Sequence, residues 1–258
     1  MLIEYPLHGR LAAIAVDYRD GQHVAVHRHQ QAQFLYAASG LMRLVTAQGA
    51  WIIPPTRAVW IPPEVEHEIF MSGAVRMRTL FIPETADAGG FSACQVLAVT
   101  ALLRELILRA IQLQHADDHA SYPLVQELIL REIAALERLP LHLPMPVDRR
   151  LQAICLRLLQ QPQHPHTLED WSQEVGASSR TLARLFRQEL QMSFQEWRQQ
   201  LRLTEALPRL LAGDSVQGVA RDLGYGSARA FSAMFRRLLG ENPREYVQAL
   251  GRLSALKG

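Results

Sequence analysis

The chain of 258 residues is 48% hydrophobic, and its 27 Lys and Arg against 25 Asp and Glu give a formal net charge of +2. This composition is ordinary for a soluble globular protein of one or two domains. No apolar run reaches the length of a membrane span, and the first ten residues lack the form of a signal peptide. Two cysteines, Cys94 and Cys155, predict buried free thiols and do not support a disulfide framework. We therefore expect a cytoplasmic protein without a membrane partner.

Charge is distributed unevenly along the chain. Residues 1–147 carry 11 Arg and 14 acidic residues, a balance of −3, whereas residues 148–258 carry 16 basic and 11 acidic residues, a balance of +5. The basic C-terminal part favours a nucleic-acid partner there. Lys257 is the only lysine. Arginine suits bidentate contact with phosphate and guanine, although a biased genome composition would explain the same excess.

Residues 10–82 contain short runs of strand-forming residues, separated by glycines and proline pairs. The runs are Ala12–Tyr18, His23–Val26, Gln33–Ala37, Leu41–Thr46, Trp51–Ile53, Ala58–Ile61, Glu66–Met71 and Val75–Ile82. Many short strands at this spacing predict a barrel or a sandwich.

Three histidines in this region form a candidate site. His27 and His29 are two residues apart, so on a strand their side chains point to one face. Gln33 follows four residues after His29, and His67 lies further along the predicted strands. We expect these four side chains to lie together.

The spacing around these residues resembles the two motifs of the cupin family. Gly21 and Gly40 flank the first pair of histidines at the family's intervals, and the segment 62–67 matches the second motif. The sequence departs from the family at Gln33, Glu64 and Met71, where Glu, Gly and Asn are usual. The resemblance implies a cupin-like barrel with the histidines on its interior.

Three interpretations of this site stay open. His27, His29, His67 and the Gln33 oxygen could hold a divalent transition metal, weakened by the missing carboxylate. The same residues could line a metal-free pocket for an organic effector, or they could serve a structural role only. The candidate effector pocket consists of His27, His29, Gln33, Tyr36, Trp51, Trp60 and His67. Its aromatic members are equally candidates for the barrel core.

From Ser92 the apolar residues follow helical spacing, which predicts one helix reaching about Ala110 and a second from about Tyr122 to Leu139. A short connection would make them a helical hairpin. Its apolar stripe favours dimerisation, with packing on the barrel as the alternative. Three prolines between Leu139 and Pro146 then predict a stiff linker. The predicted domains are a barrel at 1–90, the hairpin at 91–140, the linker at 141–147 and a DNA-binding domain at 148–258.

Two segments of the basic C-terminal region share one design. In Ser179–Arg187 and in Ala228–Arg236, apolar residues at helical spacing face one side and arginines face another. Upstream, Gly176 and Gly224 supply the tight turn that a helix-turn-helix requires. Between the two units, Phe194–Leu211 predicts one helix of 18 residues, which would span about 27 Å. Such a strut could set two recognition helices into consecutive major grooves, which lie about 34 Å apart.

Residues 148–250 resemble the AraC/XylS family of transcription regulators. The resemblance is carried by Val219–Tyr246, the family signature nearly whole, and by Leu201–Ala206, which is similar to the family's connecting helix. It implies a sequence-specific regulator and no enzyme, with a transporter or catabolic gene as candidate target. The implied partners are double-stranded DNA, a small-molecule effector, a second copy of the chain and, as a candidate, RNA polymerase.

The resemblance also implies which side chains contact DNA. They are Ser179, Arg180, Ala183, Arg184 and Arg187 in the first unit, and Arg229, Ser232 and Arg236 in the second. Arg180, Arg184 and Arg229 are candidates for base contact, because arginine can bind guanine O6 and N7 together. For each arginine the alternative is a phosphate contact or a solvated surface, and we expect phosphate contact for Arg187 and Arg236.

The predicted fold class is therefore α+β, with an N-terminal cupin-like β-barrel, a helical hairpin and an all-α domain with two helix-turn-helix units. Two other functions compete with the ligand-responsive regulator. A cupin metalloenzyme such as an oxygenase could be fused to a DNA-binding module, but the missing Glu ligand argues against it. An architectural DNA binder with a structural barrel is the other alternative.

Overall fold

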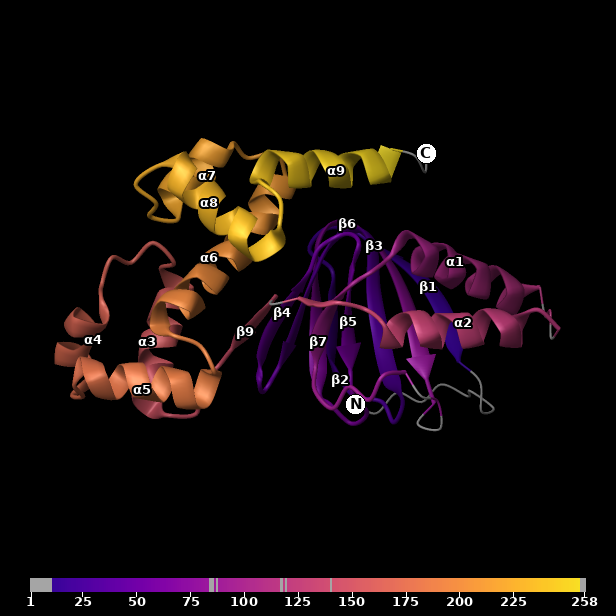
Figure 1. Cartoon of the computed structure of the whole chain (residues 1–258), viewed down its shortest axis with the longest axis horizontal. Helices are drawn as coiled ribbons and strands as arrows, with labels where there is room; N and C mark the ends of the chain where they lie inside the picture. Colours follow the sequence, from indigo (N-terminus) through magenta and orange to yellow (C-terminus); the bar gives the residue numbers. More distant parts are fainter. Residues whose placement is uncertain are drawn as a thin grey trace. The chain divides into compact units, whose positions relative to one another are not determined.

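A computed structural model describes residues 11–83, 86, 88–116, 118, 120–139 and 141–255, without the side chains of residues 115 and 250–255 (Figure 1). The chain divides into two compact units, one of Met1–Ala47 with Trp51–His142 and the other of Gln48–Ala50 with Leu143–Gly258. The first ten residues, where we expect no signal peptide, lie outside the described residues, as does Pro140, one of the three prolines from which the linker is predicted.

The N-terminal unit is built on an antiparallel sheet, as the sequence predicts. Its strands are β1 (Ala12–Tyr18), β2 (His23–His27), β3 (Ala32–Thr46), β5 (Arg57–Ile61), β6 (His67–Ile82), β7 (Gln95–Ala98) and β8 (Arg138–Leu139). Strands β4 (Gly49–Ile53) and β9 (His142–Pro144) each include residues of both units. Along the main path of the sheet the order is β1-β6-β3-β5-β7-β8, and β2 pairs with β6. This part of the predicted fold class is confirmed.

Two long strands, β3 and β6, organise this sheet. The sequence predicts a break in each, at Gly40 and at Gly73, whereas the structure continues both strands and bends them. The pairing register between them shifts on either side of Ser39. Gly40 has φ of +70°, and a Cβ atom there would lie 2.7 Å from the Ala74 carbonyl oxygen. The glycine therefore permits a bulge that bends the strand pair without ending it.

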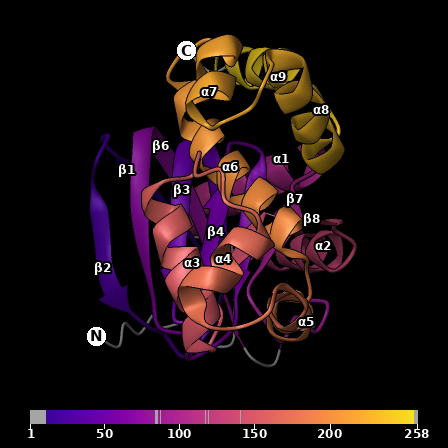
Figure 2. The same cartoon turned by 90° about the vertical axis from the view of Figure 1, so that its left-hand side faces the viewer.

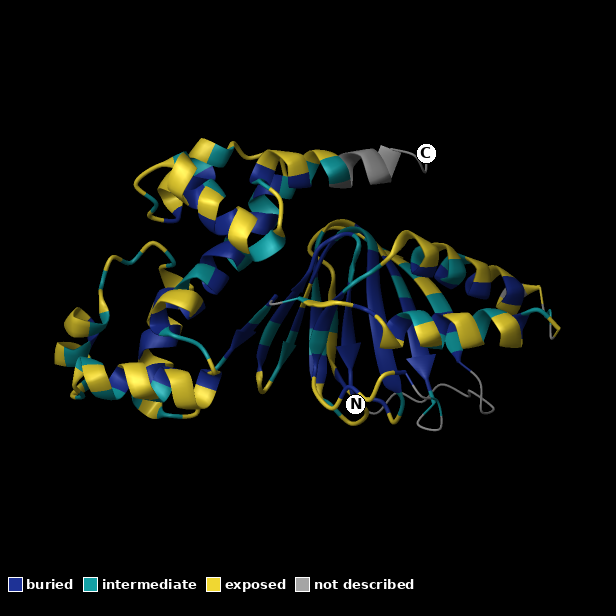
Figure 3. Ribbon diagram, in the orientation of Figure 1, coloured by how far each residue is buried: buried dark blue, intermediate teal, exposed yellow. Residues whose placement is uncertain are grey.

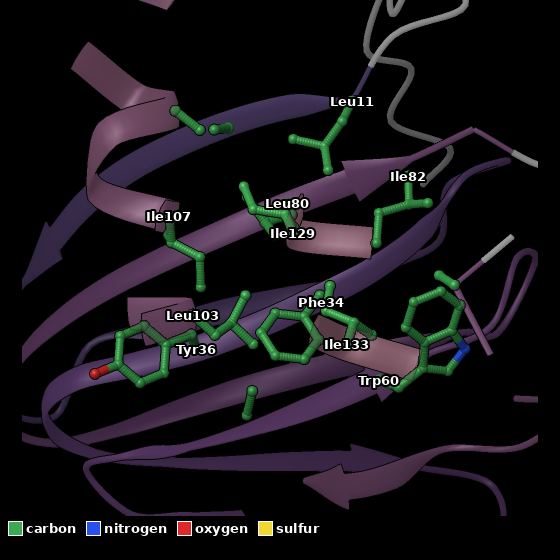
Figure 4. Packing of buried hydrophobic residues seen from close by; sticks show 14 of the residues in the cluster. Leu11, Phe34, Tyr36, Trp60, Leu80, Ile82, Leu103, Ile107, Ile129 and Ile133 are labelled. Carbon is green, nitrogen blue, oxygen red and sulfur yellow. The ribbon is translucent and has the colours of Figure 1, made fainter. Parts of the chain in front are cut away.

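Helices α1 (Ala101–His115) and α2 (Tyr122–Ala134) cover one face of this sheet (Figure 1). Leu103 and Ile107 of α1 and Ile129 and Ile133 of α2 are fully buried in one cluster with side chains of the strands (Figure 4). Tyr122 also donates a hydrogen bond from its hydroxyl to the Leu11 carbonyl, at 2.6 Å. The buried stripe of the hairpin thus packs within its own unit, which was the alternative to dimerisation.

The hairpin and the linker differ from the prediction at their ends. The first helix begins at Ala101 and the second ends at Ala134, so residues 95–98 and 138–139 form strands β7 and β8 instead. The predicted linker also contains strand β9. Leu141 and Leu143 are both 3% exposed, and burying them favours a packed segment over a solvated spacer.

The C-terminal unit is helical (Figure 2). Its helices are α3 (Arg149–Gln160), α4 (Leu168–Val175), α5 (Ser179–Leu190), α6 (Phe194–Leu211), α7 (Val216–Asp222), α8 (Ala228–Leu239) and α9 (Pro243–Ala255). Side-chain caps fix several starting points: Thr167 and Ser193 form capping boxes with Asp170 and Glu196, and Ser178 caps α5. The all-α class and the two helix-turn-helix units are confirmed.

Both cysteines are buried and unpaired, as predicted. Burial raises the pKa of Cys94 to about 12, so this thiol stays protonated and unreactive at neutral pH. None of the helices in the described part of the chain combines the length and apolarity that a membrane crossing requires.

The two predicted turn glycines invite a matched test. Gly176 and Gly224 have φ of +67° and +75°, but only at Gly224 would a Cβ atom meet close neighbours, at 2.9 Å from the Gln163 carbonyl oxygen. We expect Gly176→Ala to lower the free energy of unfolding by about 1 kcal/mol, and Gly224→Ala by at least about 2 kcal/mol. Urea unfolding of the two variants measures the difference, and equal losses would contradict the steric argument.

Candidate functional sites: two recognition helices and a buried histidine cluster

Helix α5 carries the first predicted recognition surface. It buries Leu182, Phe186 and Leu190, which fix one side of the helix against α3, α4 and α6. Figure 3 shows buried and exposed positions along the helices of this unit. The predicted DNA contacts lie on the exposed side of α5, where Arg180, Ala183, Arg184 and Arg187 are exposed and Ser179 is half-buried. Arg184 donates a hydrogen bond to Gln188 Oε1 at 2.6 Å, and Arg187 forms an ion pair with Glu196 at 3.3 Å.

Helix α8 repeats this arrangement. It buries Phe231, Met234 and Phe235, and Ser227 caps its first turn by accepting a hydrogen bond from the Ala230 amide. Arg229 and Arg236 are exposed and Ser232 is half-buried. Because exposed guanidinium groups can contact phosphates and base edges, α5 and α8 both have the surface chemistry of a DNA-reading helix.

Arg202 of α6 joins the two helix-turn-helix units, a role that the sequence analysis did not identify. It is only 5% exposed, and its Nε donates a hydrogen bond to the Pro162 carbonyl at 2.9 Å in the connection between α3 and α4. Its guanidinium also lies over the Tyr225 ring, 5.0 Å from the centroid, in the turn between α7 and α8. The buried Arg202 side chain therefore contacts both helix-turn-helix units. The only sign of this role in the sequence was the position of Arg202 within the helix predicted to connect them.

In the N-terminal unit the structure brings together four of the predicted pocket residues. His29 and His67 are 1% exposed, Gln33 is 3% exposed and His27 is 6% exposed. One ring nitrogen from each histidine lies within 4.8 Å of the others. His27 ends β2 and pairs with His67 at the start of β6, while His29 lies in the following loop and Gln33 on β3.

Backbone carbonyls fix the orientation of all three imidazoles. Nδ1 of His27, His29 and His67 donates a hydrogen bond to the carbonyl of Ala25, Gln31 and Val65, at 2.8, 2.7 and 2.8 Å respectively. Since a carbonyl can only accept, Nδ1 carries the proton and Nε2 keeps its lone pair in the neutral ring. Burial, partly offset by the Val65 carbonyl, lowers the pKa of His67 to about 4, and burial also lowers the pKa of His27.

Glu64 supports the loop that carries His29. It stands where the cupin motif has glycine, and it adopts the left-handed conformation with φ of +61°. Its amide donates a hydrogen bond to the His29 carbonyl at 2.9 Å, and its carboxylate pairs with Arg28 at 3.4 Å. Glu64 thus adopts a backbone conformation that favours glycine, the usual residue at this position of the cupin motif.

The structure separates Tyr36 and Trp60 from the histidines. Both belong to the cluster that packs against α1 and α2 (Figure 4), and Trp60 donates a hydrogen bond from Nε1 to the Phe91 carbonyl at 3.1 Å. Side chains alternate along β3, so Phe34 and Tyr36 face the helices while Gln33 faces the other way. Trp51 stacks on His142, with ring centroids 4.3 Å apart. Of the seven residues predicted for the effector pocket, the four polar ones therefore lie together in one cluster.

Two residues at the histidine cluster were not predicted. The Phe81 ring meets His29 edge-on with centroids 5.1 Å apart, and Thr79 Oγ1 accepts a hydrogen bond from Gln33 Nε2 at 2.9 Å. Both lie on β6 at positions of the same parity as His67, and that alternation was the signal that could have identified them.

Comparison with known proteins gives matches over both units. A family model described as an AraC-like ligand binding domain matches residues 8–134, and one described as a helix-turn-helix domain matches residues 171–249. The HTH-type transcriptional regulator NimR of Escherichia coli K12 is 34% identical over 232 residues, which are 89% of this chain and 84% of that protein.

Other matches are shorter or more distant. The HTH-type transcriptional regulator RipA of Corynebacterium glutamicum is 29% identical over 65% of this chain and 54% of its own. The arabinose operon regulatory protein of Escherichia coli K12 is 29% identical over 48% of this chain and 42% of its own. The crystal structure of ToxT from Vibrio cholerae matches 92% of this chain and 94% of its own at 13% identity and a TM-score of 0.38, which adds nothing to the assignment.

The Arg202 contacts predict a stability effect within the helical unit. We expect Arg202→Met to lower the free energy of unfolding by about 1–3 kcal/mol, because it removes a partly buried hydrogen bond to the Pro162 carbonyl and the contact with Tyr225. Arg221, whose side chain is 79% exposed, provides the control, and Arg221→Met should change stability by no more than about 0.5 kcal/mol. Urea unfolding of the full chain checks both, and an unaffected Arg202→Met variant would refute the structural role.

Proposed function

The chain belongs to the AraC/XylS family of helix-turn-helix transcriptional regulators, and from this premise we propose that it reads two consecutive major grooves with α5 and α8. Its function is sequence-specific DNA binding under the control of a ligand in the N-terminal unit. The observation that carries the proposal about the grooves is the repeat of one design: a buried apolar side and an exposed arginine side in both helices. The connecting helix α6 has 18 residues and would span about 27 Å, of the order of one DNA turn.

We assign different roles to the arginines of α5. Arg180 lies in its first turn and is exposed, which suits a bidentate contact with a guanine in the groove. Arg184 lies one turn further and has the same role. Arg187 contacts phosphate instead. It lines a hollow of about 490 Å³ together with residues at the beginnings of α4 and α6.

In α8 the same division applies. Arg229 begins the helix and reads a base, whereas Arg236 lies in the last turn and contacts phosphate. Ser179, Ala183 and Ser232 border these arginines and add weaker contacts with the groove.

The ligand site of the regulator lies at the histidine cluster in this proposal. Glu64, Glu66 and Glu68 are the nearby carboxylates that an oxygenase could use as bases. Glu64 pairs with Arg28, and Glu68 accepts a hydrogen bond from His23 at 2.9 Å. Because two of the three carboxylates are paired with residues outside the histidine cluster, these contacts favour a binding site over a catalytic one.

We also propose that the protein acts in the cytoplasm, with RNA polymerase as a candidate partner.

A homodimer is proposed through the outer face of the hairpin. Leu124 and Leu128 of α2 are four residues apart, so they share a face of the helix, and they are 70% and 49% exposed. Leu102 of α1 is 55% exposed. Exposed large apolar side chains on both helices of the hairpin are the chemistry expected of a subunit interface.

Arg180→Ala tests the reading of bases. We expect the variant to lose about 1–3 kcal/mol of binding free energy on a selected DNA sequence and much less on random duplexes, because a base contact acts only on the matching base. Arg157→Ala removes the same charge from an exposed position on α3 and is the control. Selection of duplexes by the full chain, followed by titrations at fixed salt, provides the measurement. An equal loss on both kinds of DNA would make Arg180 a phosphate contact.

The double substitution Leu124→Glu and Leu128→Glu tests the dimer. We expect it to convert the full chain to a monomer in sedimentation experiments, because buried unpaired carboxylates oppose association. Leu156→Glu, at a position of α3 that is 53% exposed, is the control and should leave the oligomeric state unchanged. A dimer that survives the double substitution would place the interface elsewhere.

A further inference from the structure

We propose that the N-terminal unit binds one divalent transition-metal ion, held by Nε2 of His27, His29 and His67 and by Oε1 of Gln33. The ion is the ligand that this regulator senses. The sensing role rests on the function proposed above, whereas the metal site rests on the geometry of the cluster alone.

The first argument is the direction of the free lone pairs. The carbonyls of Ala25 and Val65 accept from Nδ1 of His27 and His67, so the lone pair of each ring is on Nε2. Hydrogen bonding of the far nitrogen to a carbonyl is the arrangement that orients metal-ligating histidines and raises their basicity. All three rings have it, since His29 makes the same contact with Gln31.

The second argument is an unpartnered atom. His67 Nε2 is buried and has no hydrogen-bond partner among the described residues. A buried polar atom without a partner costs free energy, so a bound cation would remove that cost. The His67 ring lies 4.3 Å from the His27 ring and 5.1 Å from the His29 ring, measured between centroids. Its free nitrogen is therefore near the nitrogens of the other two rings.

The third argument is a contact between two acceptors. Gln33 Oε1 lies 3.0 Å from His29 Nε2, and with the proton on Nδ1 neither atom can donate to the other. In this orientation of the amide, Gln33 Nε2 donates to Thr79 Oγ1 at 2.9 Å. Two lone pairs that face each other in a buried site repel, and a cation between them turns that repulsion into attraction.

The donor set indicates the class of ion. Three imidazole nitrogens and one amide oxygen suit zinc, cobalt, nickel and related divalent ions, whereas calcium and magnesium require oxygen ligands. The set contains no carboxylate, so the charge of the ion is not neutralised by its ligands. We therefore expect weaker binding than the same site would have with a carboxylate in place of Gln33.

The ligands also come from separate segments. His27 ends β2, His29 lies in the loop that the Glu64 amide holds, Gln33 is on β3 and His67 begins β6. An ion bound to all four would cross-link these segments and stabilise the unit by mass action.

Metal binding is tested on the full chain after removal of metals with a chelator. We expect equilibrium dialysis to give one equivalent of Zn²⁺ or Co²⁺ per chain, a rise in Tm of about 5 °C or more with Zn²⁺, and the visible absorption of four-coordinate Co²⁺. His67→Ala should weaken binding at least about 100-fold and abolish the rise in Tm. His23→Ala is the control, because His23 is in the same unit but pairs with Glu68.

Gln33→Glu is the second variant. It is needed because His67→Ala could also lose metal binding by failing to fold. It adds the missing carboxylate, and we expect roughly tenfold tighter binding and a larger rise in Tm than in the unaltered chain. Absence of stoichiometric binding, equal binding by His67→Ala, or weaker binding by Gln33→Glu would each overturn the metal site.

The sensing role is measured separately, as the affinity of metal-free and Zn²⁺-loaded protein for a duplex that the protein selects from a random pool. An affinity that changes with Zn²⁺ in the unaltered chain, but not in His67→Ala, supports sensing. An unchanged affinity overturns sensing and leaves a structural ion. If neither form binds DNA, the proposed function fails, while dialysis still decides the metal site.

Discussion

The alternation of side chains along β3 and β6 is the constraint on which the N-terminal unit depends. Each of these strands presents one set of residues to helices α1 and α2 and the other set to the histidine cluster. On β3, Phe34 packs beneath the helices and Gln33 meets His29, although the two are adjacent in the chain. A shift of register by one residue would exchange the two sets, burying the Gln33 amide under the helices and removing it from the cluster. The hydrophobic packing of the hairpin therefore also holds the polar site in place.

The C-terminal unit meets a related requirement with different means. In the proposed binding mode, the two helix-turn-helix units have to keep a fixed separation to engage successive grooves, so contacts between them beyond the connecting helix are useful. Arg202 and the turn at Gly224 provide the additional contacts, because both meet the connection between α3 and α4. Burying a guanidinium costs desolvation free energy, which its hydrogen-bond and ring partners must offset. Those contacts form only in one arrangement of the neighbouring segments.

Local chemistry in the sequence was sufficient to predict the helical unit. The N-terminal caps Ser178 and Ser193 set where α5 and α6 start, and these caps involve only residues a few positions away. The bounds of the hairpin and the aromatic residues of the pocket were harder to predict, because they depend on contacts between residues far apart in the sequence. An apolar run such as residues 95–98 suits a strand or a buried helix equally, and only its pairing with β5 decides between them. Likewise, the spacing of Tyr36 and Trp60 could not reveal that both side chains face the helices. The histidine spacing did identify residues that lie together, whereas their common tautomer required the positions of three carbonyls.

The separation of core and surface on α5 and α8 has a consequence for how such regulators diverge. Leu182, Phe186, Phe231 and Phe235 hold the helices in the fold, and the exposed arginines contribute little to that packing. If α5 and α8 read DNA as proposed, substitutions on the exposed side change the preferred operator while the protein stays folded. Duplicated genes of this kind could acquire new target promoters one base contact at a time, and an engineer could transplant the exposed residues alone to redirect the protein. The two helices can also change independently, so that one half of the operator is rewritten while the other still anchors the regulator.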